Sequence, residues 1–151
     1  MKAGVVKFLS RSHELLRAKG VYQGASLFGI AAGDPTAVGQ NVPLIARHVD
    51  YIAPMVYPSL WTDQQYRVTN PALNPYTIVR RSLEDFKEKA AGTGVQWTPW
   101  LQDFSLDGIK YGDTQVWQQI RGAQDAKMGE FLLWSPRVVY HGGDLQTDAR
   151  G

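Results

Sequence analysis

The sequence contains no cysteine, and this absence excludes several kinds of site at once. Without thiols there is no disulfide framework, no thiolate nucleophile and no cysteine-based zinc site. An excess of charge of one sign is also missing, because 16 Lys and Arg residues face 14 Asp and Glu residues, for a net charge of +2. A nucleic-acid-binding protein usually carries a basic stripe, so we expect no nucleic-acid partner.

Long hydrophobic stretches are absent as well. No apolar run approaches the roughly 20 residues that span a bilayer, and the N-terminal residues lack the apolar core and cleavage site of a signal peptide. We therefore expect no membrane span and no signal peptide within this chain. The three histidines, His13, His48 and His141, show no metal-ligand spacing, so we predict no metal site and no cofactor.

What the sequence does contain is an alternation of apolar runs and amphipathic segments. Its 151 residues, 44% of them hydrophobic, suit a single domain. Short apolar runs bounded by turn residues predict strands that are buried on both faces. The predicted strands cover 24–31, 50–57, 95–103 and 130–134. The predicted helices cover 8–20, 42–48, a segment from Pro75 to Gly92 or Gly94, and a segment from Gly112 onward, and 142–151 is expected to be a loose tail.

Strands that alternate with helices are typical of parallel sheets with right-handed crossovers. Four strands make half of an eight-stranded barrel, which typically needs ~250 residues. We therefore predict an α/β fold that forms the C-terminal half of a (β/α) barrel, about four βα units of a TIM barrel. The strands should lie side by side in sequence order, with helices on the outer face. A compact four-stranded α/β layer is the alternative, but it needs edge strands that are more polar than these.

Polar side chains follow the predicted strands at their C-terminal ends, where a (β/α) barrel builds its site. Asp103 is the best candidate for a catalytic acid, and a turn-capping role is its alternative. Acid–base catalysis by paired carboxylates needs two such groups, and no second one stands at an equivalent strand end. The loop residues Asp34 and Asp63 are weaker candidates for the second acid. Asp50 and Glu130 begin their strands, so we place them at the opposite end of the sheet.

Aromatic residues near the strand ends suit a platform for a sugar ring. Their faces pack against the C–H face of a pyranose, and their N–H and O–H groups donate to its hydroxyls. The candidate substrate-binding residues are Tyr57, Trp61, Trp100, Gln102 and Trp134; core filling is the alternative for each tryptophan. Because side chains alternate along a strand, Trp100 and Gln102 share one face, while Trp97 and Asp103 share the other. Ser59 and Ser135 have no histidine at a suggestive spacing, which weakens a Ser-His-Asp hydrolase.

Three strings of residues resemble a known family. They are Pro54-Met-Val-Tyr-Pro-Ser59, Pro99-Trp-Leu-Gln-Asp-Phe104 and Leu132-Leu-Trp-Ser-Pro136. Together and in this order they are similar to a glycoside hydrolase family of bacterial TIM-barrel domains, DUF4015. The resemblance extends from about residue 4 to about residue 140, and it implies strands five to eight of the family's barrel.

The resemblance also implies a carbohydrate ligand and, for an intact protein, hydrolysis of a polysaccharide outside the cytoplasm or at the cell surface. The family's strand-four motif, Asp-Tyr-x-Arg-Phe, whose Asp is the natural candidate for a catalytic carboxylate, does not occur here. We therefore expect a fragment that is inactive alone. A non-catalytic carbohydrate-binding domain and a structural half-barrel that dimerises are the alternatives.

A half-barrel leaves its first and last strands unpaired, and edge strands expose unmet N–H and C=O groups. Two copies related by a two-fold axis would close eight strands and cover both edges. We therefore expect a homodimer that closes the barrel, or soluble aggregates, rather than a well-behaved monomer. The expected apolar patch consists of Leu27, Phe28, Ile30, Phe131 and Leu133.

Overall fold

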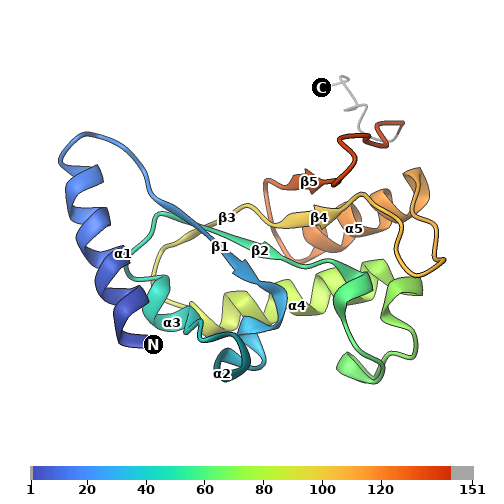
Figure 1. Ribbon diagram of the computed structural model, residues 1–151, viewed down its shortest axis with the longest axis horizontal. Helices are drawn as coiled ribbons and strands as arrows, with labels where there is room; N and C mark the ends of the chain where they lie inside the picture. Colours follow the sequence, from blue (N-terminus) through green and yellow to red (C-terminus); the bar gives the residue numbers. More distant parts are fainter. Residues whose placement is uncertain (1, 144–151) are drawn as a thin grey trace.

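The computed structural model describes residues 2–143, which form a parallel sheet with helices packed on one face (Figure 1). The strands are β1 (Gly24–Phe28), β2 (Tyr51–Met55), β3 (Gln96–Trp97), β4 (Trp100–Gln102) and β5 (Leu132–Trp134). They lie in the order β1-β2-β4-β5, β3 also pairs with β2, and every pairing is parallel. The predicted α/β fold with parallel strands in sequence order is confirmed, and the sheet is open rather than closed into a barrel.

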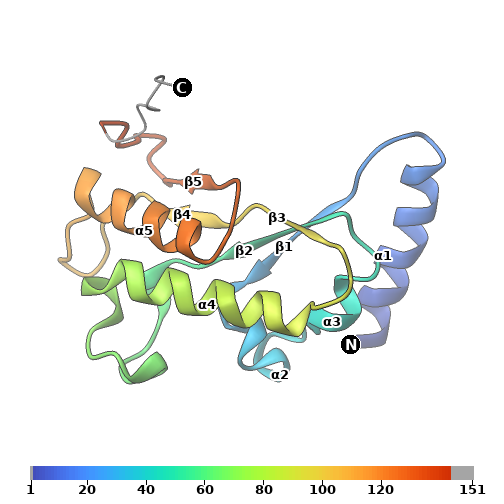
Figure 2. The same cartoon turned by 180° about the vertical axis from the view of Figure 1, so that it is seen from behind.

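Three long helices and two short ones accompany the sheet among the described residues. The helices are α1 (Lys2–Arg17), α2 (Pro35–Val38), α3 (Val42–Ile45), α4 (Pro75–Lys89) and α5 (Asp113–Asp125). Helices α4 and α5 cover one face of the sheet, which is the near side in Figure 2. Helix α1 stands at the far end of the molecule, beyond β1 and β2 (Figure 1). The part of the predicted tail from residue 144 onward lies outside the described residues.

The predicted strand over 95–103 is divided in two, and prolines explain the gap. The Thr98 N–H donates to the Ile52 carbonyl at 3.0 Å, and the Val56 N–H donates to the Trp100 carbonyl at 3.2 Å. Between these bonds the ladder would need a donor at Pro54, which has no N–H. The chain continues in the same register past the gap, so β3 and β4 act as one interrupted strand.

The first strand is shorter than predicted, because residues 29–32 form a 3-10 turn instead of continuing it. Gly29 lies so close to β2 that an added Cβ would stand 2.5 Å from the Met55 carbonyl oxygen. Helix α4 begins at Pro75, as predicted, and no side chain caps its N-terminus. The side-chain amide of Asn74 donates to the carbonyls of Thr69 and Asn70 rather than accepting from the helix.

The core fills the space between the sheet and its helices in two clusters. One gathers Leu27, Ile45, Ile52 and Phe86, and the other gathers Val56, Leu83, Leu101, Val116 and Ile120. Helices α4 and α5 approach closely at Gly122, where an added Cβ would stand 2.7 Å from the Tyr76 carbonyl oxygen. A glycine at that position therefore sets the distance between α4 and α5.

The opposite face of the sheet carries exposed apolar side chains. Phe28 is 52% exposed, Leu132 is 37% exposed and Trp134 is 45% exposed. Of the five residues that the sequence analysis predicted for this patch, only Phe28 lies in it. The other four lie on the helix side or in the turn after β1: Leu27 is buried, Ile30 is half-buried, and Phe131 and Leu133 pack against the second cluster.

Among residues 2–143, no helix is both long enough and apolar enough to cross a membrane.

Candidate functional site

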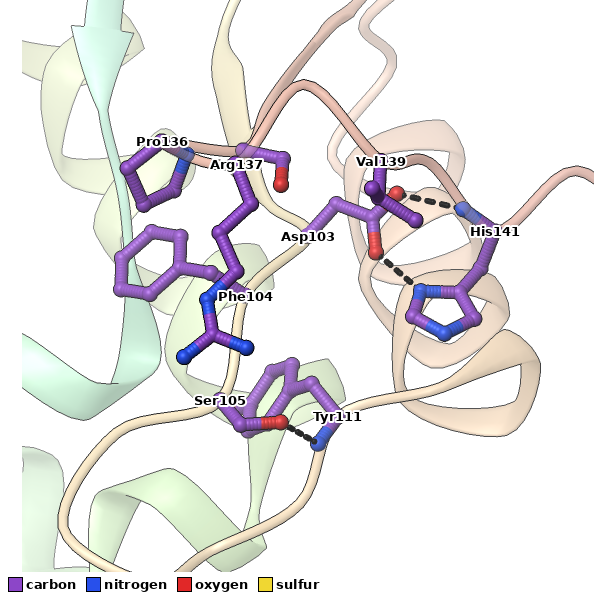
Figure 3. A pocket seen from close by; sticks show the side chains of 9 residues that line it. Asp103, Phe104, Ser105, Tyr111, Pro136, Arg137, Val139 and His141 are labelled. Carbon is purple, nitrogen blue, oxygen red and sulfur yellow. Dashed lines mark hydrogen bonds and ion pairs between the residues drawn. The ribbon is translucent and has the colours of Figure 1, made fainter.

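A cavity of about 270 Å³ opens where β4 and β5 end (Figure 3). Three segments form its walls: the residues after β4, the residue two places before α5, and the chain after β5. The lining residues are Asp103, Phe104, Ser105, Tyr111, Ser135, Pro136, Arg137, Val139 and His141. The cavity therefore lies at the C-terminal ends of parallel strands, the position that sites occupy in this class of fold.

Asp103 is held at the base of this cavity by the strand ladder. Its N–H donates to the Trp134 carbonyl at 2.8 Å, so the residue extends β4 beyond Gln102. Its side chain is 0% exposed. The carboxylate accepts two hydrogen bonds from His141, one from the backbone N–H at 2.7 Å and one from Nδ1 at 2.6 Å.

The pairing with Asp103 determines which nitrogen of His141 is available. An ionised carboxylate can only accept, so Nδ1 carries the hydrogen that joins the two side chains. The other ring nitrogen, Nε2, bonds to no residue in the described part of the chain, and the His141 side chain is 39% exposed. The buried acid thus orients an imidazole that is partly exposed at the cavity wall.

The remaining polar groups of the cavity are mostly hydrogen-bond donors. Arg137 reaches from the segment after β5 toward Ser105 and Tyr111 (Figure 3). The Ser105 hydroxyl oxygen accepts from the Tyr111 N–H at 3.0 Å, which leaves its own hydrogen to donate. The Tyr111 phenol donates away from the cavity to the Ala72 carbonyl at 2.8 Å, and burial raises the pKa of this phenol.

Gln102 and Tyr57 lie beside the cavity but do not line it. The Gln102 side chain is fully buried; its carbonyl accepts from the Ser59 N–H, and its amide donates to the Ser59 hydroxyl and the Phe104 carbonyl. The hydrogen bonds of this side chain therefore join the segment after β2 to the segment after β4. Tyr57 packs edge-on against Phe104 with ring centroids 5.6 Å apart, and burial raises the pKa of its phenol to about 12.

Trp100 and Trp134 meet on the exposed sheet face. Their ring centroids lie 6.1 Å apart at an interplanar angle of 85°, and the Trp100 indole N–H donates to the Ser26 hydroxyl at 3.1 Å. Neither ring lines the cavity beside Asp103. Trp61 lies elsewhere, with its ring 5.2 Å from that of Tyr66. Of the predicted sugar-binding residues, the structure brings together this one tryptophan pair.

The other carboxylates considered from the sequence lie away from Asp103. Asp34 accepts from backbone N–H groups at the start of α2, and Asp63 accepts from the Asn70 N–H within its loop. Asp50 lies at the opposite end of the sheet, as predicted, and accepts from the Gln23 N–H at 2.8 Å. That hydrogen bond and the nearby His13 lower the pKa of the Asp50 carboxyl despite its partial burial. Glu130 stands by Thr98 and does not line the cavity.

Sequence reasoning missed the contributions of His141 and Arg137. His141 was considered only as a possible metal ligand, and Ser135 was set aside for lack of a nearby histidine. Asp103 and His141 are 38 residues apart in the sequence, and only the pairing of β4 with β5 brings them together. Among residues 2–143, no group of three or more His, Cys, Asp or Glu side chains is arranged to hold a metal ion.

Comparison with known proteins agrees with the resemblance noted in the sequence. The model of the DUF4015 family, described as "Putative glycosyl hydrolase domain", matches residues 1–140. The fold is similar to that of the PgaB (BpsB) glycoside hydrolase domain from Bordetella bronchiseptica, with a TM-score of 0.63 and 14% sequence identity. The similarity covers 89% of this chain and 38% of that chain, so this chain spans well under half of the solved domain. No curated protein matches the sequence significantly.

Proposed function

The chain belongs to the DUF4015 family of glycosyl hydrolase domains, and from this premise we propose that it binds a polysaccharide without hydrolysing it on its own. The observation that carries the proposal is the pair formed by Trp100 and Trp134, in which one ring stands edge-on to the other. Indole faces pack well against the C–H face of a pyranose ring, and the Trp134 N–H can donate to its hydroxyls, whereas the Trp100 N–H already donates to Ser26.

The surroundings of this pair suit a sugar chain. Trp134 is 45% exposed, and Phe28 and Leu132 extend the apolar surface on the same sheet face. Ser26 lies on β1, which is separated from β4 by β2, and its hydroxyl accepts from the Trp100 indole N–H and so orients that ring. The family membership supplies the ligand class, and the exposed tryptophan pair supplies a surface for it.

Hydrolysis needs more than these residues provide. A glycosidase generally places two carboxylates on either side of the bond that it cleaves. In the described part of the chain, Asp103 is the one carboxylate that lines the cavity, and its oxygens are engaged by His141. We therefore propose that Asp103 contributes to a ligand site through His141 and is not sufficient for turnover.

Binding is tested by following tryptophan fluorescence while the chain is titrated with bacterial exopolysaccharides and cell-wall glycans. Trp134→Ala should weaken binding roughly fivefold, because an aromatic contact of this kind is worth about 1 kcal/mol. Trp117→Ala is the matched control, since Trp117 is 41% exposed on α5, on the helix side of the molecule. Equal losses for both variants would contradict the placement of the sugar on the sheet face.

Turnover is tested separately with the same polysaccharides by measuring the release of reducing ends. We expect none from the chain alone. Release that Asp103→Asn abolishes would show that a second acid exists in the chain. Release that Asp103→Asn leaves intact would show that the chemistry lies away from this cavity.

A second candidate role is a structural half-barrel that dimerises. The observation that favours it is the exposed sheet face, together with the two edge strands β1 and β5. Two copies would close the barrel by pairing each β1 with the partner's β5. Burial of apolar surface at ~25 cal/mol per Å² would favour this closure.

Association is measured by light scattering coupled to size exclusion. A dimer should appear at about twice the 16.8 kDa chain mass, and Leu132→Glu should convert it to a monomer by placing a charge on the covered face. Closure would also bury Trp134, so polysaccharide binding should then weaken as the protein concentration rises. A monomer with a cooperative thermal transition would rule out this role.

A further inference from the structure

We propose that the cavity beside Asp103 binds the carboxylate of an acidic sugar residue, with Arg137 as the charged partner of that group. The proposal rests on the proposed carbohydrate-binding function and adds a substrate class to it. It arises from the charges and hydrogen-bonding capacity of the cavity wall rather than from the tryptophan pair.

The first step is the balance of charge in the cavity. Arg137 is exposed and lines the space, and within residues 2–143 no ion pair involves it. The one acidic residue of the lining is Asp103, whose side chain is 0% exposed and already paired with His141. The cavity therefore offers a guanidinium without offering an accessible carboxylate to neutralise it.

The second step is the kind of hydrogen bond that the wall can make. Ser105 uses its oxygen to accept from the Tyr111 N–H, and its hydrogen has no acceptor among the described residues. Ser135 contributes another hydroxyl to the lining. Donors surrounding a planar guanidinium suit a carboxylate, because guanidinium and carboxylate form two parallel N–H···O bonds.

The third step is size. A volume of about 270 Å³ lies just below the range of about 300–1,000 Å³ that is typical of sites for drug-sized ligands. It accommodates one sugar unit, or the acidic end of one, rather than a stretch of polymer. Phe104, Pro136 and Val139 supply apolar walls for the C–H face of that unit.

The test compares D-glucuronate with D-glucose, which share a ring and differ in the carboxylate at C6. The full chain is titrated with each sugar, and the ¹H–¹⁵N signals of the His141 amide and the Arg137 Nε–H are followed by NMR. We expect both signals to shift with glucuronate, and we expect glucuronate to bind at least roughly tenfold more tightly than glucose, as a charge-assisted pair predicts.

Two variants locate the effect. Arg137→Gln should abolish the preference for glucuronate, whereas Arg137→Lys should retain part of it, because lysine keeps the charge but lacks the fork. Arg11→Gln is the control for net charge; Arg11 lies on the exposed surface of α1, where it pairs with Glu14. This variant should keep the full preference.

Several results would overturn the proposal. They are equal affinity for the two sugars, a preference that survives Arg137→Gln, and acetate shifting the same signals as strongly as glucuronate, since the sugar ring would then add nothing. If these results occur while Trp134→Ala still weakens polysaccharide binding, the acidic-sugar site fails and the proposed function stands. If the glucuronate preference holds while no polysaccharide binds, the proposed function fails.

Discussion

Two aspartate–histidine pairs stand at opposite ends of the sheet and are built differently. At the N-terminal end, His13 of α1 lies 3.2 Å from Asp50, and the two side chains are 16% and 18% exposed. At the C-terminal end, His141 lies 2.6 Å from Asp103, and the two side chains are 39% and 0% exposed. Both side chains of the first pair are largely buried, whereas the second pair combines a buried acid with a partly exposed imidazole.

The surroundings of the two pairs show what this difference means. Asp50 also accepts from the Gln23 N–H, and the Gln23 amide donates to the carbonyls of Leu9 and His48. This network fastens α1 to the start of the sheet. Asp103, by contrast, bonds only to His141 through its side chain, within the described residues. The same pairing therefore attaches a helix at one end of the sheet and holds a partly exposed imidazole at the wall of a cavity at the other.

The largest expected effect comes from breaking the pair at the C-terminal end. Asp103→Ala should lower the free energy of unfolding by about 2 kcal/mol, because it leaves the His141 donors without their acceptor and empties buried space. Urea denaturation measures the loss. Glu88→Ala removes an acidic residue from the exposed surface of α4 and should change stability by less than about 0.5 kcal/mol. Similar losses for the two variants would show that the Asp103–His141 pair contributes no more to the free energy of unfolding than an exposed residue does.

Removing each histidine tests whether only the pair at the N-terminal end attaches a helix to the sheet. His13→Ala should cost about 1 kcal/mol and should loosen α1, because the side chain joins that helix to Asp50. Limited proteolysis should then cleave the segment between α1 and β1 faster. His141→Ala should also cost at least about 1 kcal/mol, because it removes the Nδ1–H donor from the carboxylate of Asp103, whose side chain is 0% exposed. If α1 is cleaved no faster in His13→Ala, the attachment role of the first pair is wrong.

The smallest effect concerns pH at the N-terminal pair. The pKa of Asp50 is lowered in the folded protein, chiefly by the Gln23 N–H. Its stabilising contribution is therefore fully present above the ordinary carboxyl pKa of about 4 and is lost as the pH falls through the lower, folded value. Asp50→Asn should be less stable than the parent chain at pH 7 by several tenths of a kcal/mol, and the gap should close below pH 4. A gap that widens in acid would contradict the sign of this shift.

The sequence allowed the strand order to be predicted because each apolar run is bounded by turn residues and followed by a helical pattern. Pro75 marked the start of α4 correctly, since a proline suits the first turn of a helix. The division of the third predicted strand was also accessible, because Pro54 in a central strand cannot donate to its neighbour. No comparable signal marks the turn at Gly29, because that turn depends on how closely β2 approaches.

The candidate site was predictable only in part. Asp103 follows a strand and was found by position, and the tryptophans at strand ends were found by residue type. Their partners were not found, because His141 and Arg137 lie in an irregular segment whose hydrophobic pattern carries no period. The strand register decides that Trp100 stands opposite Leu132 and Gln102 opposite Trp134. Register depends on pairing between distant residues, which a single sequence does not specify.

The order of the strands has a consequence for how such a chain folds and how it can be inherited. Each strand pairs with the strand of the neighbouring βα unit, but the paired residues lie far apart in the sequence, as Gly24 and Tyr51 or Tyr51 and Gln96 do. Long chain segments must therefore close before these contacts form, and we expect folding to be slow compared with that of a helical bundle. A further unit can join at β1 or at β5 without threading through the existing sheet. Gene fusion and duplication can therefore lengthen a sheet of this kind while its existing units keep their arrangement.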